Sequence, residues 1–330
     1  MRQVGILTKP PKPKPFKARP KPEFWQAVHR AAARQVPAFR RAFLKTIRAA
    51  ARSVPTADLV GLLERNRPEL AVDLFNRDRI EAAYGKELLP LIHTMMSRAA
   101  RLALPSVMEF GKAAGGPAVG DLGIGGVLGM SSPEAIRAAA IFAGAEVTLI
   151  TEATRSALRE IIRNAQASGI TIPDQARAIA RELKQGVGLT APQIKSLERL
   201  TEGWTEAGLS QSRINTLRAE TRLRMIGQRS IAIAHNETME AANLGVEELW
   251  EEAIKDDLLP TTVIREWLTQ PGLNSENPCE ICRPMDGQRR PMGVAFTSPF
   301  NGATALRPGI HIRCMCIVVI ARDQISPIVY

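Results

Sequence analysis

The sequence has no long hydrophobic run and few aromatic side chains. No window approaches the roughly 18 consecutive apolar residues of a membrane-spanning helix, so we predict no membrane partner. No apolar signal core precedes the N-terminal prolines, which argues against secretion. Aromatic residues make up only 5% of the 330 positions, so aliphatic residues must supply most of the core. The apolar fraction of 45% excludes wholesale disorder, and we expect a soluble intracellular protein of roughly two domains.

Acidic residues are nearly absent from the N-terminus. Residues 1–50 contain 13 Lys or Arg and one acid, Glu23, whereas the rest of the chain contains 31 basic and 32 acidic residues. The formal net charge of +11 is therefore an N-terminal property. This distribution favours an arm that touches a polyanion or an acidic protein over a body that wraps DNA.

Residues 1–22 form the most biased segment, with six prolines, seven Lys or Arg and no acid. Alternating Pro and Lys favours an extended, disordered, polyproline-like arm. Such an arm either docks on double-stranded DNA or a protein partner, or only keeps the chain soluble. The candidate contact residues are Lys9, Lys12, Lys14, Lys17, Arg19 and Lys21.

The middle of the chain is predicted to be helical. Apolar residues recur at intervals of three and four over residues 23–110, where Pro37, Pro55 and Pro68 are expected to separate short helices. Residues 111–131 are rich in glycine but contain neither G-x-G-x-x-G nor G-K-S/T, so we interpret them as a linker and not a phosphate loop.

Residues 132–245 are expected to hold four further helices, over 132–167, 173–184, 192–207 and 210–244. The last should end at Gly245, because glycine is typical just after a helix C-terminus. Its arginines alternate with glutamates, which favours a solvated face over a nucleic-acid surface. These arginines are Arg213, Arg218, Arg222, Arg224 and Arg229.

Residues 246–330 are predicted to form a small α+β or β-rich unit. An acidic run leads into a β-branched and aromatic segment at 261–267, and Ile317–Ile320 is a second strand candidate. The predicted fold is thus mainly α, with a small C-terminal α+β zinc-binding unit.

All four cysteines lie in this last unit, as Cys279-x-x-Cys282 and His311-x-x-Cys314-x-Cys316. Thiolates and imidazole suit tetrahedral Zn²⁺, and C-x-x-C can aim two sulfurs at one ion. We favour Cys279, Cys282, His311 and Cys314 as ligands, with Cys316 as an alternative to His311. Neither set leaves an open catalytic position. Disulfides or simple buried thiols are the other interpretations.

An enzyme must also be considered. His235-x-Glu237 and Pro278-Cys279-x-x-Cys282 match the H-x-E…P-C-x-x-C pattern of zinc deaminases. That scheme places His235 within a helix and leaves His311, Cys314 and Cys316 unexplained. A papain-like pairing of a cysteine with His311 lacks an orienting third residue. We therefore predict no enzymatic activity.

Several motifs together resemble the phage head morphogenesis family, the Mu F-like minor head proteins of tailed double-stranded DNA phages. Members share an I-A-x-T-E…N-x-G helical stretch, a strand with Trp, C-x-x-C, an Asp-Gly turn and H-x-x-C-x-C before an apolar strand. The matching positions in this chain, over roughly residues 135–330, are Ile233, Ala234, Glu237, Asn243, Gly245, Trp267, Cys279, Cys282, Asp286, Gly287, His311, Cys314 and Cys316. The chain departs from the family at His235-Asn236, at Ile312-Arg313 and at Met315.

The resemblance implies a non-enzymatic minor capsid protein of the virion. It would associate with the portal protein and with major capsid or scaffold protein during head assembly in the host cytoplasm, and in some relatives with packaged DNA. Two other functions remain open: a zinc-dependent nucleotide or base deaminase, and a free zinc-containing DNA-binding protein.

Overall fold

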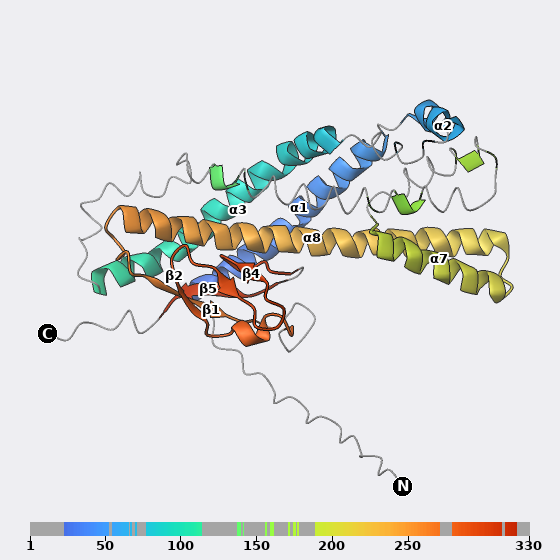
Figure 1. Cartoon of the computed structure of the whole chain (residues 1–330). Coiled ribbons are helices and arrows are strands. Elements are labelled where there is room, and N and C mark those ends of the chain that lie inside the picture. Colours follow the sequence, from blue (N-terminus) through green and yellow to red (C-terminus); the bar gives the residue numbers. More distant parts are fainter. Residues whose placement is uncertain are drawn as a thin grey trace, which may run out of the picture.

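The computed structural model describes residues 23–52, 55–65, 77–113, 189–270, 279–311 and 314–321, together with short pieces between 67 and 177. Three predicted parts of the chain fall wholly or largely outside the described residues. They are the arm, almost all of the Gly-rich linker, and most of the two helices expected over 132–167 and 173–184. The described chain is mainly helical, with a small β-containing region at its C-terminal end (Figure 1). None of its described helices is long and apolar enough to cross a membrane.

Three long helices form the body: α1 (Glu23–Arg52), α3 (Arg77–Ala113) and α8 (Gln211–Lys255). The short helix α2 (Thr56–Glu64) follows α1. Trp25, Phe39 and Phe43 are fully or almost fully buried on one face of α1, and Met95 and Met96 are fully buried on α3. These faces pack against α8 in one continuous apolar core, as their helical spacing requires.

The expectation that prolines divide the N-terminal region was wrong at Pro37, which lies inside α1; Pro90 and Pro105 likewise lie inside α3. An internal proline costs a helix about 3 kcal/mol through one lost hydrogen bond and a steric clash. The buried side chains on both sides of Pro37 offset that cost by packing in the core. Pro55 does mark a boundary, because it is the N-cap residue of α2.

Helix α7 (Ala191–Glu206) confirms the helix predicted over 192–207, and it pairs with the first half of α8 through a short turn (Figure 1). Its start is fixed by a capping box in which Thr190 and Gln193 exchange hydrogen bonds. Ser210 caps α8 by accepting a bond from the Arg213 amide, 3.4 Å away. Helix α8 therefore begins where the sequence predicted.

Helix α8 does not end at Gly245, and that prediction was wrong. It continues to Lys255 and takes up part of the acidic run. A Cβ added at Gly245 would lie 2.3 Å from the carbonyl oxygen of Met96, so the glycine allows α3 and α8 to touch backbone to backbone. Its role is a close helix crossing and not a C-cap.

The two parts of α8 have different surroundings. We call Gln211–Gln228 the outer segment, where Ile214, Thr221 and Arg222 are the buried residues, and Arg229–Lys255 the inner segment, most of which is buried. The solvated-face prediction holds for Arg213 and Arg224, which are exposed. It fails for Arg222 and Arg229, which are buried. Arg229 stacks over the ring of Phe43 in α1, 5.7 Å from its centroid.

The C-terminal region contains a three-stranded antiparallel sheet in the order β2-β1-β5. A second pair, β3 with β4, forms a small hairpin. β5 confirms the strand predicted at its position, whereas β1 starts three residues later than predicted. The strands are β1 (Ile264–Leu268), β2 (Arg289–Pro291), β3 (Phe296–Thr297), β4 (Thr304–Ala305) and β5 (Ile317–Ile320).

This sheet packs directly on the helices (Figure 1). The indole Nε1 of Trp25, at the start of α1, donates a hydrogen bond of 3.1 Å to the carbonyl oxygen of Val318 in β5. Trp267 of β1, Val318 and Trp250 of α8 belong to the same buried apolar cluster as the helices. The first turns of α1 are thus joined to the last strand across most of the sequence.

Candidate metal centre

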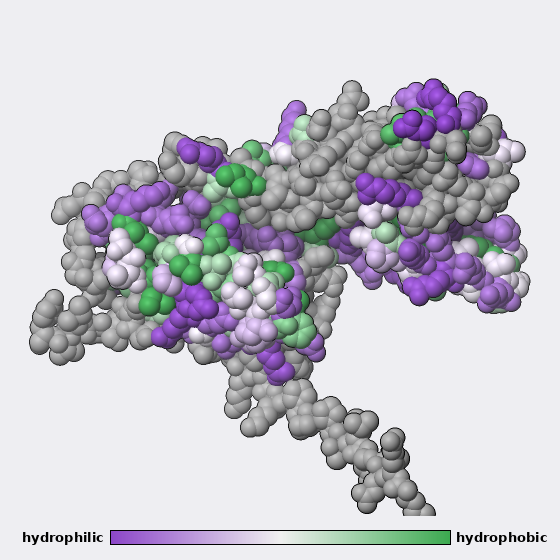
Figure 2. Space-filling view, viewed as in Figure 1, coloured by the Kyte–Doolittle hydropathy of each residue, from purple (hydrophilic) through white to green (hydrophobic). Residues whose placement is uncertain are grey.

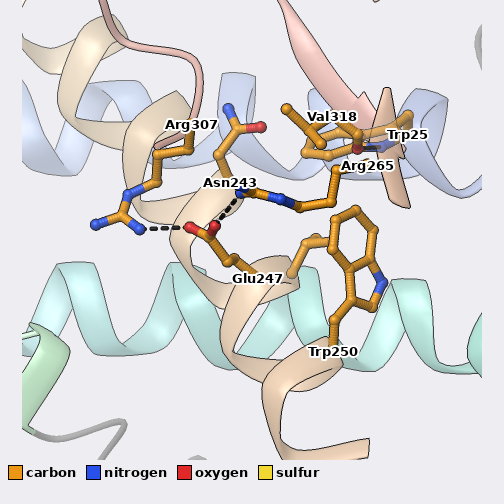
Figure 3. Close-up of a pocket in the computed structure, with 8 residues that line it drawn as sticks. Trp25, Asn243, Glu247, Trp250, Arg265, Arg307 and Val318 are labelled. Carbon is orange, nitrogen blue, oxygen red and sulfur yellow. Dashed lines mark hydrogen bonds and ion pairs between the residues drawn. The ribbon is translucent and has the colours of Figure 1, made fainter. Parts of the chain in front are cut away.

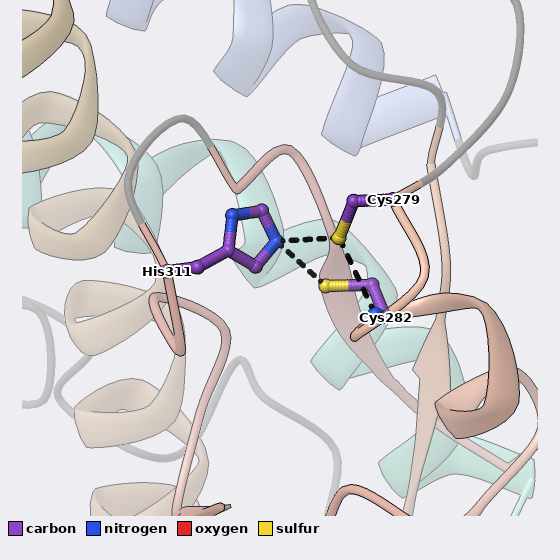
Figure 4. Close-up of side chains that lie close together, drawn as sticks. All are labelled: Cys279, Cys282 and His311. Atoms are coloured by element: carbon purple, nitrogen blue, oxygen red, sulfur yellow. Dashed lines mark hydrogen bonds between the residues drawn. The ribbon is translucent and has the colours of Figure 1, made fainter. Parts of the chain in front are cut away.

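The Cys279-x-x-Cys282 segment forms a tight turn directly before the 3-10 helix η2 (Arg283–Met285). The amide of Cys282 points at the sulfur of Cys279, 3.4 Å away, and the amide of Arg283 donates to the carbonyl of Cys279 at 2.9 Å. These bonds fold the backbone so that both sulfurs face the same side (Figure 4). This is the arrangement that the C-x-x-C spacing predicted.

The second group of donors enters from the segment before β5. Leu268 of β1 pairs with Ile317 of β5, so Cys316 lies where the two strands end, next to Thr269, whose hydroxyl contacts the backbone of Cys282. The Cys314 amide donates to the His311 carbonyl at 3.2 Å, which closes a turn between these two donors. Sheet pairing therefore brings together side chains about thirty positions apart in sequence.

The five predicted donors converge in two overlapping groups. Cys279, Cys282 and His311 form one, and Cys282, Cys314 and Cys316 form the other; within each group the donor atoms lie within 4.8 Å of one another. The Nε2 atom of His311 lies 3.0 Å from the Cys279 sulfur and 2.9 Å from the Cys282 sulfur (Figure 4). Cys282 belongs to both groups and is the centre of the cluster.

The distances fit a small tetrahedral ion. Two thiolates on one Zn²⁺ are about 3.8 Å apart, and a thiolate and an imidazole nitrogen about 3.5 Å apart, given the usual bond lengths. The sulfurs of Cys282 and Cys314 are 3.8 Å apart. The contacts of His311 are about half an ångström shorter than the ideal edge, so a small outward rotation of the imidazole would accommodate the ion.

Most of the thiols in the cluster are buried, so the pKa of each depends on its neighbours. Cys282, Cys314 and Cys316 are each at most 3% exposed, whereas Cys279 is exposed and His311 is partly buried. Hydrogen bonds from Cys282 and Cys314 hold the pKa of Cys316 well below its usual value. Contacts with Cys314 and Cys316, and then burial, raise the pKa of Cys282. A largely buried set of thiols with one imidazole is the donor set typical of a closed structural site.

Polar contacts fix the turns that carry the cysteines. The hydroxyl of Thr269 donates to the carbonyl of Cys282 at 2.8 Å, and the hydroxyl of Ser298 donates to the carbonyl of Ile281 at 3.0 Å. The Asp286-Gly287 turn returns the chain to β1, since Gly287 has a φ of +76° and donates to the carbonyl of Trp267 at 2.8 Å. The Oδ1 atom of Asp286 accepts a hydrogen bond from the backbone amide of Thr269.

The His311 loop rests on α8. Gly309 has a φ of +135°, and a Cβ there would lie 2.5 Å from the carboxyl carbon of Glu240. Glu240 in turn accepts a hydrogen bond from the Asn236 side chain at 2.6 Å. The helix motif around Asn236 and the metal-ligand motif therefore meet in space, which their separation in sequence did not indicate.

The deaminase pattern is split in the structure, because its two cysteines belong to the cluster and its His235-x-Glu237 half does not. His235 and Glu237 are buried in the inner segment of α8, at 8% and 2% exposed. Neither belongs to either group of clustered donors. The predicted contact residues of the arm, from Lys9 to Lys21, lie outside the described residues.

One buried charged cluster was missed by the sequence reasoning. Arg265 of β1 is 1% exposed, and its guanidinium donates to Glu247 of α8 (Figure 3). It also donates to three backbone carbonyls, those of Leu306, Pro291 and Val294, at 2.7–3.2 Å. Arg307 pairs with the other oxygen of Glu247.

This cluster ties the loops around the candidate metal centre to α8. A signal existed in the sequence, because Arg265 falls between Val263 and Trp267 at the period of two that marks one face of a strand. Both neighbours are fully buried, and the guanidinium also stacks over Phe296, 5.2 Å from its centroid.

Comparison with known proteins gives no relatives. No family model, no curated protein and no solved structure matches this chain.

Proposed function

We propose that this chain is a minor head protein of a tailed double-stranded DNA phage, whose C-terminal unit is held by a structural zinc ion. The observation that carries the proposal is the convergence of Cys279-x-x-Cys282 with His311-x-x-Cys314-x-Cys316 beside a Trp-bearing strand. This is the set of motifs on which the resemblance to the Mu F-like family rests. A long helical body suited to docking accompanies it.

Zinc would be held by Cys279, Cys282 and Cys314 with His311, and Cys316 is the alternative to His311. A closed thiolate-rich site supplies no open position for substrate, so the ion would act as a staple and not as a catalyst. The position of the candidate site in the fold supports this structural role. The ligand-bearing turns are joined to α8 through Gly309 and through the carbonyls bound by Arg265, so the ion would lock the C-terminal region onto the helices.

The protein would associate with portal protein and with major capsid or scaffold protein inside the head. The test is to co-express the tagged chain with the portal and capsid proteins encoded by its neighbouring genes. Mass spectrometry of purified heads should find it in few copies relative to capsid protein. Heads that exclude the chain, or neighbouring genes that encode no portal or capsid protein, would contradict the proposal.

The deaminase remains the second candidate because of the H-x-E…P-C-x-x-C match. The burial of Glu237 in α8, outside both donor groups, argues against it. Zinc-loaded protein should not deaminate cytidine, adenosine or single-stranded DNA. Turnover that disappears in Glu237→Gln would favour the enzyme over the head protein.

A further inference from the structure

The outward face of α1 carries a row of cationic side chains. Five exposed residues form this row, which we call the α1 basic ridge: Arg30, Arg34, Arg41, Lys45 and Arg48. At 100° per residue all five fall within an arc of about 60°, along about 27 Å of helix. The buried side chains of Trp25, Phe39 and Phe43 occupy the opposite face, so packing holds the ridge toward solvent.

The ridge has a single sign of charge. No Asp or Glu occurs between residues 24 and 52, and Glu23 in the first turn is the only acid of α1. Lys45 pairs with Glu87 of α3 at 2.6 Å. The four arginines make no ion pair within the part of the chain that the structure describes. The exposed face of α8 differs, because Arg213 and Arg224 there lie on the same side of the helix as Glu220.

Neighbouring side chains on this face indicate the kind of partner. Between the cations the exposed residues are small, namely Ala33, Pro37 and Ala49, so a bulky anion can approach the guanidinium groups. Over residues 23–49 no exposed side chain is aromatic or large and apolar. Protein interfaces usually need such an apolar centre, and single-stranded nucleic acids need aromatic platforms for stacking. Arginines alone suit the phosphate backbone of a duplex.

We infer that the α1 basic ridge binds the phosphate backbone of double-stranded DNA without reading its sequence. This deepens the proposed function by assigning the DNA contact to a rigid helix face in addition to the arm, and it rests on that function only for the choice of ligand. Its failure is distinguishable, because head association and zinc content of the unsubstituted chain are measured separately from duplex binding.

The experiment compares three full-length proteins by fluorescence anisotropy with a labelled, mixed-sequence DNA duplex over a range of salt concentrations. The test variant is Arg34→Gln/Arg41→Gln. The matched control is Arg213→Gln/Arg224→Gln, which removes two exposed arginines from the mixed face of α8. Each lost phosphate contact should reduce the log–log salt slope by about 1. We expect the test variant to lose about 2 from the slope and more than about tenfold in affinity at about 0.1 M salt.

Three results would overturn the inference: no binding of duplex by the unsubstituted chain, an unchanged slope in the test variant, or an equal loss in the control. Binding of poly-glutamate as tightly as duplex would instead assign the ridge to an acidic protein. Both variants should keep the unfolding midpoint of the unsubstituted chain, because the replaced side chains are exposed. If the test variant fails to fold, Arg30→Gln/Arg48→Gln should give the same change in slope.

Discussion

The outer and inner segments of α8 are parts of one helix, but different neighbours cover them. The outer segment is flanked by α7 and shows a mainly hydrophilic surface at that end of the molecule (Figure 2). The inner segment is enclosed by α1, α3 and the C-terminal sheet. A helix that is buried over most of its surface is expected to be mostly apolar, yet this one buries polar side chains such as Ser230, Thr238 and Asn243.

Local bonds explain how the inner segment tolerates these groups. The Asn243 side chain donates to the carbonyl of Met239 at 3.0 Å, and the Thr238 hydroxyl donates to the carbonyl of Ala234. Glu247 is neutralised by Arg265 and Arg307 from the sheet side. The inner segment therefore depends on its partners, whereas the outer segment depends mainly on its own caps and on α7.

If the cluster binds zinc as proposed, loss of the ion should have the largest effect on stability, confined to the inner segment and the C-terminal region. Structural zinc contributes on the order of 10 kcal/mol in small sites. Because Cys282 belongs to both donor groups, Cys282→Ser should abolish zinc binding, whereas Cys279→Ser and Cys316→Ser should each only weaken it. Hydrogen exchange should then rise sharply in 264–321 and in the inner segment, with 191–228 unchanged. Equal protection in chelator and in zinc would contradict this.

Gly245→Ala should have the next largest effect. The added Cβ would meet the Met96 backbone at 2.3–2.7 Å, and backbone cannot rotate away as a side chain can. We expect a loss of about 4 kcal/mol in the free energy of unfolding, measured by urea denaturation. The matched control is Gly227→Ala in the outer segment, where the nearest atom, at the end of the Arg40 side chain, is 3.9 Å away. That change should stabilise the helix by about 0.5–1 kcal/mol. If Gly245→Ala and Gly227→Ala lower the free energy of unfolding by similar amounts, the two segments do not differ in this respect.

Arg265→Met should destabilise the inner side by about 3–5 kcal/mol. Removing one partner of a buried ion pair leaves Glu247 less well neutralised and three backbone carbonyls without their donor. Arg213→Met, on the exposed start of α8, serves as the control and should change the unfolding free energy by no more than about 0.5 kcal/mol. A loss below about 1 kcal/mol for Arg265→Met would show that water or Arg307 replaces its contacts.

The smallest effect concerns pH. Burial, followed by the charge of Glu251, raises the pKa of Glu248 from its ordinary 4.5 to about 7, although Arg307 opposes the shift. The folded protein therefore holds a proton that the unfolded chain releases, and the unfolding free energy should fall as pH rises from 4.5 to 7.

Glu248→Gln should remove this dependence and raise stability at pH 8 by about 1–2 kcal/mol, allowing for solvent screening of the half-buried carboxyl. Thermal unfolding at pH 5 and pH 8 measures this change in stability. Glu220→Gln, on the exposed outer segment, is the control. If the stability of Glu248→Gln changes between pH 5 and pH 8 as much as that of the unsubstituted chain, the pH dependence does not come from Glu248.

Local patterns in the sequence were enough for several elements. The starts of α7 and α8 and the apolar strand Ile317–Ile320 depend on neighbouring residues, so local patterns predicted them, and the structure adds the caps at Thr190 and Ser210. The set of five metal-ligand candidates was also readable, because thiolates and imidazole at short spacing have few other uses. The sequence favoured four of these donors and kept Cys316 as the alternative to His311, but it did not indicate that Cys282 lies in both groups.

Only the tertiary structure decided the rest, because it depends on contacts between distant residues. Pro37 and Gly245 look like helix ends when judged by local preference, but packing of α1 and α3 against α8 carries both helices through them. The bond between Trp25 and Val318 joins positions 293 residues apart, and the ion pair of Arg265 with Glu247 crosses from sheet to helix. Propensity and spacing describe a residue and its near neighbours. The burial of a charge and the close approach of two backbones are set by which surfaces meet in the folded chain.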